Sequence, residues 1–180
     1  LFGMSQPMGA RVLNAWPADG LPPGAVYLSV GDSAATDLPD RSVDAVVTDP
    51  PFFDNVHYSE LADFFHVWQR LWFDDADAAP SETTRSQQEV QDRDQARFSD
   101  KLCAVFGECH RVLKDDGLMV FSYHHSRDDG WTSVAAAVLH AGFRLVQAQP
   151  VKAEMSVAMP KLAAKSPIDL DVLMVCRKAA

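Results

Sequence analysis

The chain has 180 residues, of which 47% are hydrophobic and 23% are charged, which is the composition of a single globular domain. This balance excludes fibrous, disordered and disulfide-stapled proteins, and no apolar run approaches the roughly 20 residues that a membrane-spanning helix needs. The 25 acidic residues outnumber the 16 basic ones, and the net charge of -9 is opposite to that of an autonomous nucleic-acid-binding domain. If the protein acts on DNA, we therefore expect regions outside this chain to hold the phosphates.

Local charge and cysteine content add two further expectations. Acidic residues concentrate at residues 72–100, which predicts a solvated loop, whereas residues 151–178 are locally basic and are the better candidate for contacting a polyanion. An odd number of cysteines at no metal-ligand spacing predicts buried thiols in a reducing compartment, by default the cytoplasm, and no metal site. The cysteines are Cys103, Cys109 and Cys176.

The first predicted elements follow a stretch that is rich in proline and glycine. Residues 1–24 are expected to form an irregular lead-in, and residues 25–180 the folded domain. Short apolar runs at residues 25–30 and 43–48, each bounded by turn residues, predict two buried strands. From residue 61 to residue 72 apolar side chains recur every three or four positions, which predicts a helix packed mostly in the core.

The second half of the chain continues the alternation of strands and helices. Helices are predicted at residues 100–113 and 131–140, and strands at residues 118–123, 143–148 and 172–176. This order predicts an α/β fold with a doubly wound sheet. Because no helix separates the last two strands, we expect them to be antiparallel neighbours.

Polar residues follow three of the predicted strands. Ligands of doubly wound sheets bind at the carboxyl ends of the strands, so these residues should line one edge of the sheet. They are Gly31, Asp32 and Ser33 after the first strand, Asp49, Pro50, Pro51 and Phe52 after the second, and Tyr123, His124 and His125 at the end of the third.

The sequence at residues 49–52 carries the clearest chemistry. An acidic residue and two prolines form a rigid polar ledge beside an aromatic ring, which suits a planar heterocycle with an amino group. Asp49 and the Pro50 carbonyl can each accept a hydrogen bond from that amine, while Phe52 stacks on the ring. Two acceptors draw the nitrogen lone pair out of conjugation, so that the amine can attack an electrophilic methyl group.

These residues also carry a family resemblance. The Asp-Pro-Pro-Phe sequence after a Val-Asp-Ala-Val-Val-Thr strand resembles the catalytic motif of amino-methyltransferases that act on adenine N6 or cytosine N4. The chain is similar to the predicted adenine-specific DNA methylases, a family of large proteins that often carry a zinc ribbon, from about residue 31 to residue 178. The similar segments are residues 48–65, 121–125, 141–143, 150–156 and 168–171.

The resemblance implies a class I, Rossmann-like methyltransferase fold that uses S-adenosylmethionine, with residues 25–180 as the catalytic domain. It assigns Asp49, Pro50, Pro51 and Phe52 to catalysis, and Asp32, Ser33 and Asp49 to the cofactor, although Asp32 could equally be a helix cap. The residues expected to border the substrate base are Phe52, Phe53, Asn55, Tyr58, His124 and His125.

Two departures from the family pattern stand out. The chain has no Gly-x-Gly turn for the cofactor, and no second strand ends in an acid that could bind the ribose. The sequence, which begins at Leu1, therefore corresponds to the third to seventh strands of the fold, and is expected to be either a fragment or a permuted domain. In the usual order the missing strands lie between the third and the fourth, so we expect an exposed sheet edge and self-association.

The resulting expectation is an S-adenosylmethionine-dependent DNA amino-methyltransferase, with adenine N6 as the target on a base flipped out of the duplex. The isolated chain could be inactive. One alternative is a related enzyme acting on RNA or on protein glutamine, whose ledge usually begins with Asn. Another is a catalytically silent interaction module of a larger assembly.

Overall fold

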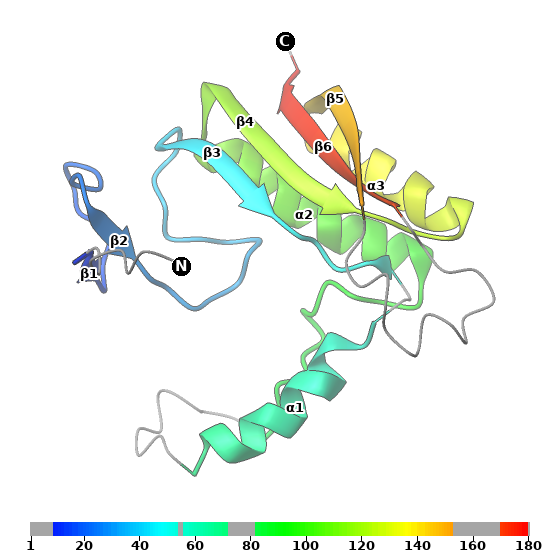
Figure 1. Cartoon of the computed structure of the whole chain (residues 1–180), viewed down its shortest axis with the longest axis horizontal. Helices are drawn as coiled ribbons and strands as arrows, with labels where there is room; N and C mark the ends of the chain where they lie inside the picture. Colours follow the sequence, from blue (N-terminus) through cyan, green and yellow to red (C-terminus); the bar gives the residue numbers. More distant parts are fainter. Residues whose placement is uncertain (1–8, 54–55, 72–81, 153–169, 180) are drawn as a thin grey trace, which may run out of the picture.

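The computed structural model describes residues 9–53, 56–71, 82–152 and 170–179 of the chain. β1 and β2 form a small parallel sheet, and the other strands form a mixed sheet in the order β3-β4-β6-β5, which confirms the predicted α/β fold (Figure 1). Among the described residues the elements are β1 (Arg11–Leu13), β2 (Ala25–Tyr27), β3 (Val43–Thr48), α1 (Tyr58–Gln69), α2 (Gln95–Val112), β4 (Leu113–Tyr123), α3 (Asp128–His140), β5 (Phe143–Lys152) and β6 (Leu170–Lys178).

Strand pairing places the predicted site at one edge of the mixed sheet. β3 runs parallel to β4, with Thr48 opposite Phe121, so the residues that follow both strands emerge side by side. β6 is antiparallel to β4 and to β5, which confirms the antiparallel pairing expected for the last two strands. The carboxyl ends of β3 and β4 therefore meet where ligands of α/β sheets bind.

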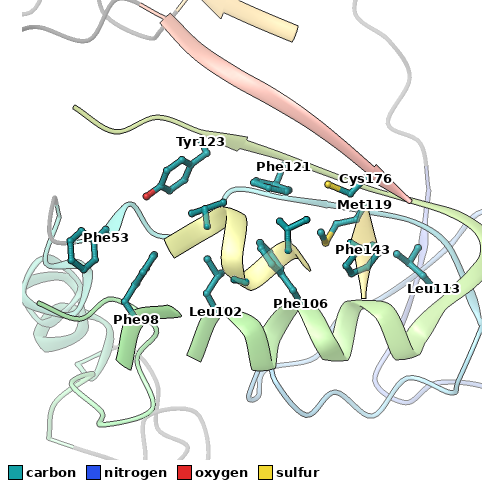
Figure 2. Close-up of a cluster of buried hydrophobic side chains, with 13 residues drawn as sticks. Phe53, Phe98, Leu102, Phe106, Leu113, Met119, Phe121, Tyr123, Phe143 and Cys176 are labelled. Carbon is teal, nitrogen blue, oxygen red and sulfur yellow. The ribbon is translucent and has the colours of Figure 1, made fainter. Parts of the chain in front are cut away.

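The hydrophobic core lies between the mixed sheet and two helices that cover the same face. Alternate side chains of β4 point toward α2 and α3, because successive residues of a strand face opposite sides. Full burial of each large apolar side chain contributes about 1.5–3 kcal/mol. Figure 2 shows this cluster, in which the residues under 2% exposed include Phe98, Leu102, Phe106, Leu113, Met119, Phe121, Tyr123, Val134, Phe143 and Cys176.

Several element boundaries differ from the sequence prediction. α2 begins at Gln95 rather than at residue 100, because the Asp94 side chain caps it by accepting a hydrogen bond from the Arg97 backbone N–H at 2.9 Å. β4 begins directly after α2, at Leu113, although the charged sequence before Gly117 predicted a loop there. A register shift opposite β3 accommodates these extra residues in the strand.

The lead-in is not wholly irregular, and the strand predicted at residues 25–30 is shorter than expected. Arg11–Leu13 forms β1, which pairs with β2, and β2 ends at Tyr27, with Val30 fully exposed. The prediction that residues 25–30 form a buried strand is wrong, because β2 pairs in the small sheet and lies apart from the core of the mixed sheet (Figure 1).

The prediction that α1 packs in the core is also wrong. The helix forms where the periodicity predicted it, but none of its residues is buried, and it projects away from the mixed sheet (Figure 1). The core against the mixed sheet is formed with α2 and α3 and includes no residue of α1. The side chains left 59–71% exposed are Leu61, Phe64, Phe65, Val67, Trp68 and Leu71.

The polar side of α1 is fastened by the chain that returns toward α2. Asp63 accepts hydrogen bonds from Thr83, from the Thr84 backbone N–H at 2.6 Å and from Arg85 Nε at 3.0 Å. These hydrogen bonds, those of Thr84 above all, hold the pKa of Asp63 well below its usual range. The acidic stretch predicted to be solvated is therefore folded back along α1 in the part that the structure describes.

β3 is the outer strand of the mixed sheet among the described residues, and it is less buried than predicted. Its outer edge faces no further strand in this part of the chain, and the Val47 side chain is 80% exposed. A Val-rich parallel strand is normally covered on both faces and paired on both edges. The exposed edge expected from the missing strands is thus present at β3.

The predicted burial of the cysteine thiols holds fully for one of the three. Cys176 is buried, whereas Cys103 and Cys109 are intermediate. Burial raises the pKa of both Cys109 and Cys176 to about 11, so these thiols are protonated at neutral pH. Within the described ranges, no helix has the length and apolarity to cross a bilayer, and no three His, Cys, Asp or Glu side chains gather as metal ligands would.

Candidate active site

The acidic residue at the end of β3 is oriented by the neighbouring strand. Ser122 of β4 donates a hydrogen bond to Asp49 Oδ1 at 2.5 Å, and the Asp49 side chain remains exposed. Parallel pairing of β3 with β4 brings the two residues together although they are 73 positions apart. The sheet therefore presents one carboxylate oxygen in a defined direction while leaving the group accessible.

The rest of the ledge combines backbone rigidity with an aromatic ring. Asp49, Pro50, Pro51 and Phe52 together are called the shelf below. Pro50 is buried and Phe52 is partly exposed. The Phe52 ring lies 4.3 Å from the His124 ring and 5.6 Å, edge to face, from the Tyr123 ring. Tyr123, at the end of β4, and His124, which follows it, thus hold the Phe52 ring in place.

Phe53 does not lie where a substrate base could stack on it. It is only 3% exposed and packs in the core at 5.2 Å from Phe98 (Figure 2). The Arg127 guanidinium lies 5.4 Å from its ring. Its φ of +21° is unusual for a bulky residue, and burial of the ring holds it there. We correct the substrate-binding role predicted for Phe53, because the turn after the shelf directs it inward as an anchor.

Tyr58, at the start of α1, closes a small pocket over the shelf. The pocket has a volume of about 280 Å³ and is lined by Asp49, Pro51, Tyr58, Glu89, Val90 and Gln91. Burial raises the pKa of the Tyr58 hydroxyl, and the nearby Asp49 charge acts in the same direction, so the hydroxyl stays protonated as a hydrogen-bond donor. The start of α1 is held there by the Ser59 backbone N–H, which donates to Glu89 Oε1 at 3.1 Å.

His124 is backed by an acidic residue from the last strand. Its Nδ1 atom lies 2.5 Å from Asp171 Oδ1, and the two side chains are 20% and 21% exposed. The two atoms lie within ion-pair distance, although their geometry is not that of a hydrogen bond. Asp171 therefore fixes the imidazole against the Phe52 ring.

His125 has a packing role instead. Its Nδ1 atom lies 3.1 Å from the Arg127 backbone nitrogen, and its ring lies against Gly130 in the first turn of α3. The ring is also 5.8 Å from Phe53. Adjacent residues of an extended chain point to opposite sides, so His124 turns toward the shelf and His125 toward the helix. The substrate-binding role of His125 stays a prediction, and the contacts in the structure give this side chain a packing role.

Comparison with known families matches this site-bearing part of the chain. The model of a DNA methylase family, that of the N6 and N4 amino-methyltransferases, matches residues 43–168, which is well over half of the sequence. The chain belongs to this DNA methylase family. Curated proteins give no match.

Solved structures give weaker similarity to this methylase. One is the structure of a Thermus thermophilus protein that is described as a DNA modification methylase and is complexed with S-adenosyl-L-methionine. It is 18% identical to this chain with a TM-score of 0.46, and the match covers 84% of this chain and 54% of that one. Another, described as a SAM-dependent methyltransferase from Methanosarcina mazei, is 9% identical with a TM-score of 0.45, and covers 91% and 72%. The chain spans about half the length of the Thermus protein.

The residues predicted to bind the cofactor do not all lie together. Asp32 and Ser33 are exposed in a turn, where Asp32 accepts a hydrogen bond from the Ala34 backbone N–H at 2.8 Å, and no helix begins there, so the structure does not support the alternative role of a helix cap. A hollow of about 1180 Å³ lies beside β2, but it borders β3 at Val43–Ala45 and not at Asp49. The described residues thus provide the shelf but do not enclose a cofactor next to it.

Two residues of the site were missed in the sequence. Ser122 and Asp171 orient Asp49 and His124, and each lies on a strand whose apolar pattern drew attention away from it. The sequence signal that could have identified Asp171 is that it is the one acidic residue in the otherwise apolar first part of β6. Asn55, which was expected to border the base, lies outside the described residues.

The fit of His125 against Gly130 gives a stability prediction. A Cβ atom at Gly130 would lie 2.4 Å from the His125 ring, so we expect Gly130→Ala to lower the free energy of unfolding by about 1–3 kcal/mol. Gly107, in the middle of α2, has open space, and Gly107→Ala should raise that free energy by about 0.5–1 kcal/mol. Urea unfolding of both variants measures the difference, and equal stabilisation of both would refute the packing role of His125.

Proposed function

We propose that this chain provides the catalytic shelf of an S-adenosylmethionine-dependent DNA amino-methyltransferase that modifies adenine N6. The observation that carries the proposal is the Asp49 carboxylate, oriented by Ser122 and exposed next to the Phe52 ring at the carboxyl end of β3. Membership of the N6 and N4 DNA methylase family supports the reaction class. We further propose a cytoplasmic location, in keeping with free thiols.

The chemistry follows from hydrogen bonding to the target amine. Asp49 and the Pro50 carbonyl accept its two N–H hydrogens and rotate its lone pair out of conjugation, while Phe52, held by His124, stacks on the flipped base. When bound, S-adenosylmethionine supplies the electrophilic methyl group. Asp49 is well suited to stabilise the positive charge that develops on the amine nitrogen.

The same shelf would accept cytosine, because both bases present an exocyclic amine with two hydrogens. The pocket beside Tyr58 has a volume of about 280 Å³, which is large enough for either ring. We favour adenine because the segments similar to the predicted adenine-specific methylases recur along most of the sequence. Mass spectrometry of digested product DNA distinguishes 6-methyladenine from 4-methylcytosine.

The experiment that tests the function is transfer of radiolabelled methyl groups from S-adenosylmethionine to unmethylated DNA, by this chain and by the complete gene product. Transfer to DNA supports the proposal. Transfer to RNA or to protein glutamine, with none to DNA, would favour the related enzymes. Absence of any transfer by the complete gene product would favour a silent interaction module.

The pair of Asp171 and His124 gives a prediction for the same assay. Asp171→Ala removes the group that fixes the imidazole 4.3 Å from Phe52, so we expect the KM for DNA to rise by about tenfold, while kcat changes less. Asp171→Asn retains a polar side chain of the same shape beside Nδ1 and should restore most of the affinity. An unchanged KM in Asp171→Ala would show that Asp171 has no positioning role.

We also propose that the exposed edge of β3 is an association surface. Its unpaired backbone groups and the 80% exposed Val47 are features of an edge that pairs with another chain. Light scattering of the purified chain tests this, since a monodisperse monomer would contradict it.

A further inference from the structure

Basic side chains line a hollow next to the pocket that borders Asp49 and Tyr58, which is called the shelf pocket below. It has a volume of about 770 Å³ and carries four permanent positive charges and three carboxylates on its lining. The net charge of the whole sequence is -9, whereas the charges on the lining of this hollow sum to +1. The basic residues are Arg85, Arg93, Arg97 and Lys101, and together they define what we call the basic hollow.

Helical spacing places Arg97 and Lys101 one turn apart on α2, and tertiary folding adds Arg85 from the chain that returns from α1. The stretch at residues 72–100 is acidic overall, but its three arginines come to one side where the chain returns from α1 toward α2. Arg85 is tied to Asp63 of α1 at 3.0 Å, and Arg93 Nη2 lies 3.3 Å from His57 Nε2. Both segments that flank the shelf pocket thus contribute to the basic hollow.

Two of the three carboxylates of the basic hollow, those of Glu89 and Asp92, hold its walls together. Asp92 accepts hydrogen bonds from Arg97 and Lys101, which hold its pKa well below its usual range, and Glu89 accepts from the Ser59 backbone N–H. Each guanidinium carries five N–H donors, and Arg85 uses Nε for Asp63. The arginine side chains are exposed, so they can donate to an oxyanion while they keep their internal partners.

The basic hollow is adjacent to the place where the target amine would bind. Glu89 and Gln91 line both the basic hollow and the shelf pocket. A base that is flipped onto the shelf remains attached to its sugar and to two phosphates, which must lie within one nucleotide of the pocket. Guanidinium groups at that distance match the geometry of phosphate oxygens.

We infer that the basic hollow binds the phosphodiester backbone next to the flipped nucleotide. The inference rests on the proposed function, and it changes the expectation that regions outside this chain supply all of the grip on DNA. The basic hollow is the part of that grip which this chain itself provides. Its contacts to phosphate would position the strand without reading its sequence.

The test is binding of a fluorescein-labelled unmethylated duplex, measured by anisotropy between about 50 and about 200 mM salt, a range over which phosphate contacts weaken strongly. We expect Arg85→Gln with Arg93→Gln to weaken binding by about tenfold and to reduce the slope of log K against log salt by about 2. The matched control is Arg11→Gln with Arg144→Gln, which removes the same charge from exposed positions outside the basic hollow. The control should change the affinity by less than about twofold, because distant surface charges are screened.

Further variants separate a phosphate contact from loss of structure and from failure of the proposed function. Arg85→Lys with Arg93→Lys keeps the charge and should retain most of the binding, whereas a folding defect would persist. Asp49→Ala should lose methyl transfer but keep duplex binding. The inference would be overturned if Arg85→Gln with Arg93→Gln bound the duplex as well as the Arg11→Gln with Arg144→Gln control, or if the unaltered chain did not bind at the lowest salt. Either result would count against it even if methyl transfer depends on Asp49. Arginine-dependent binding without methyl transfer would uphold it and remove the proposed function.

Discussion

Asp49→Ala is expected to lower methyl transfer to DNA by about 100-fold or more, which is the size of effect seen when a preorganised group that stabilises developing charge is removed. In the mechanism that we propose, the carboxylate accepts a hydrogen bond from the target amine and faces the positive charge that forms on its nitrogen. Ser122 already orients Asp49 Oδ1 at 2.5 Å, so alanine removes both the acceptor and its preorganisation. The measurement is incorporation of radiolabelled methyl groups into unmethylated DNA by the complete gene product.

Two comparison variants make this result specific. Ser122→Ala keeps the carboxylate but removes its hydrogen-bond donor, so a smaller loss of about tenfold is expected. Asp44→Ala removes an exposed carboxylate from the same strand, where Asp44 is bound to Lys114 at 2.6 Å and lies away from the shelf. Its activity should equal that of the unaltered protein. Full activity of Asp49→Ala would exclude Asp49 from the chemistry.

Glu108→Ala is expected to have the largest effect on stability. Glu108 is 9% exposed on α2 and accepts hydrogen bonds from the Thr36 backbone N–H at 2.8 Å and from two nitrogens of Arg111. Arg111 also donates to the Leu38 carbonyl at 2.8 Å, so the pair fastens the segment between β2 and β3 to α2. Removing the buried acceptor should lower the free energy of unfolding by about 3 kcal/mol.

The pH dependence of this contribution has a defined sign. Hydrogen bonds from Arg111, followed by those from Thr36, lower the pKa of Glu108 to about 2, against 4.5 for an unperturbed Glu. Because the folded-state pKa is the lower one, the contribution is fully present above pH 4.5 and is lost as the pH falls toward 2. The difference in unfolding free energy between the unaltered chain and Glu108→Gln should therefore shrink on acidification over this range.

Asp115→Ala is the control for the Glu108 variants. Asp115 is 73% exposed and lies 3.4 Å from Arg41 and 3.7 Å from Lys178, so its removal should cost less than about 1 kcal/mol. Urea unfolding at pH 7 measures both variants. Equal stability of Glu108→Ala and Asp115→Ala would contradict the structural role of the Glu108 carboxylate.

Much of the fold could be predicted because local patterns encode local conformation. The three- and four-residue spacing of apolar side chains identified α1 and α2, and short apolar runs identified β3 and β4. The position of Asp49 at a strand end followed from the same run, because a proline pair cannot continue a central strand. Element boundaries were less exact, since Asp94 caps α2 earlier than its apolar pattern begins.

What packs against each element could not be read in this way. α1 has the pattern of a core helix, yet its apolar side is exposed, because α2 and α3 already cover the inner face of the sheet. Phe52 and Phe53 are equivalent in the sequence, but the backbone turn after the shelf leaves the first partly exposed and buries the second. These differences depend on which surfaces are already covered when the elements assemble.

The sequence by itself thus determined the α/β class, the shelf and the family resemblance, all of which depend on residues close together in the chain. Only the tertiary structure decided that Ser122 orients Asp49, that Asp171 fixes His124 and that the arginines of an acidic stretch meet beside the shelf. The partners in the first two pairs are separated by tens of residues. Their meeting depends on strand register and on the path of the returning chain, which no local spacing encodes.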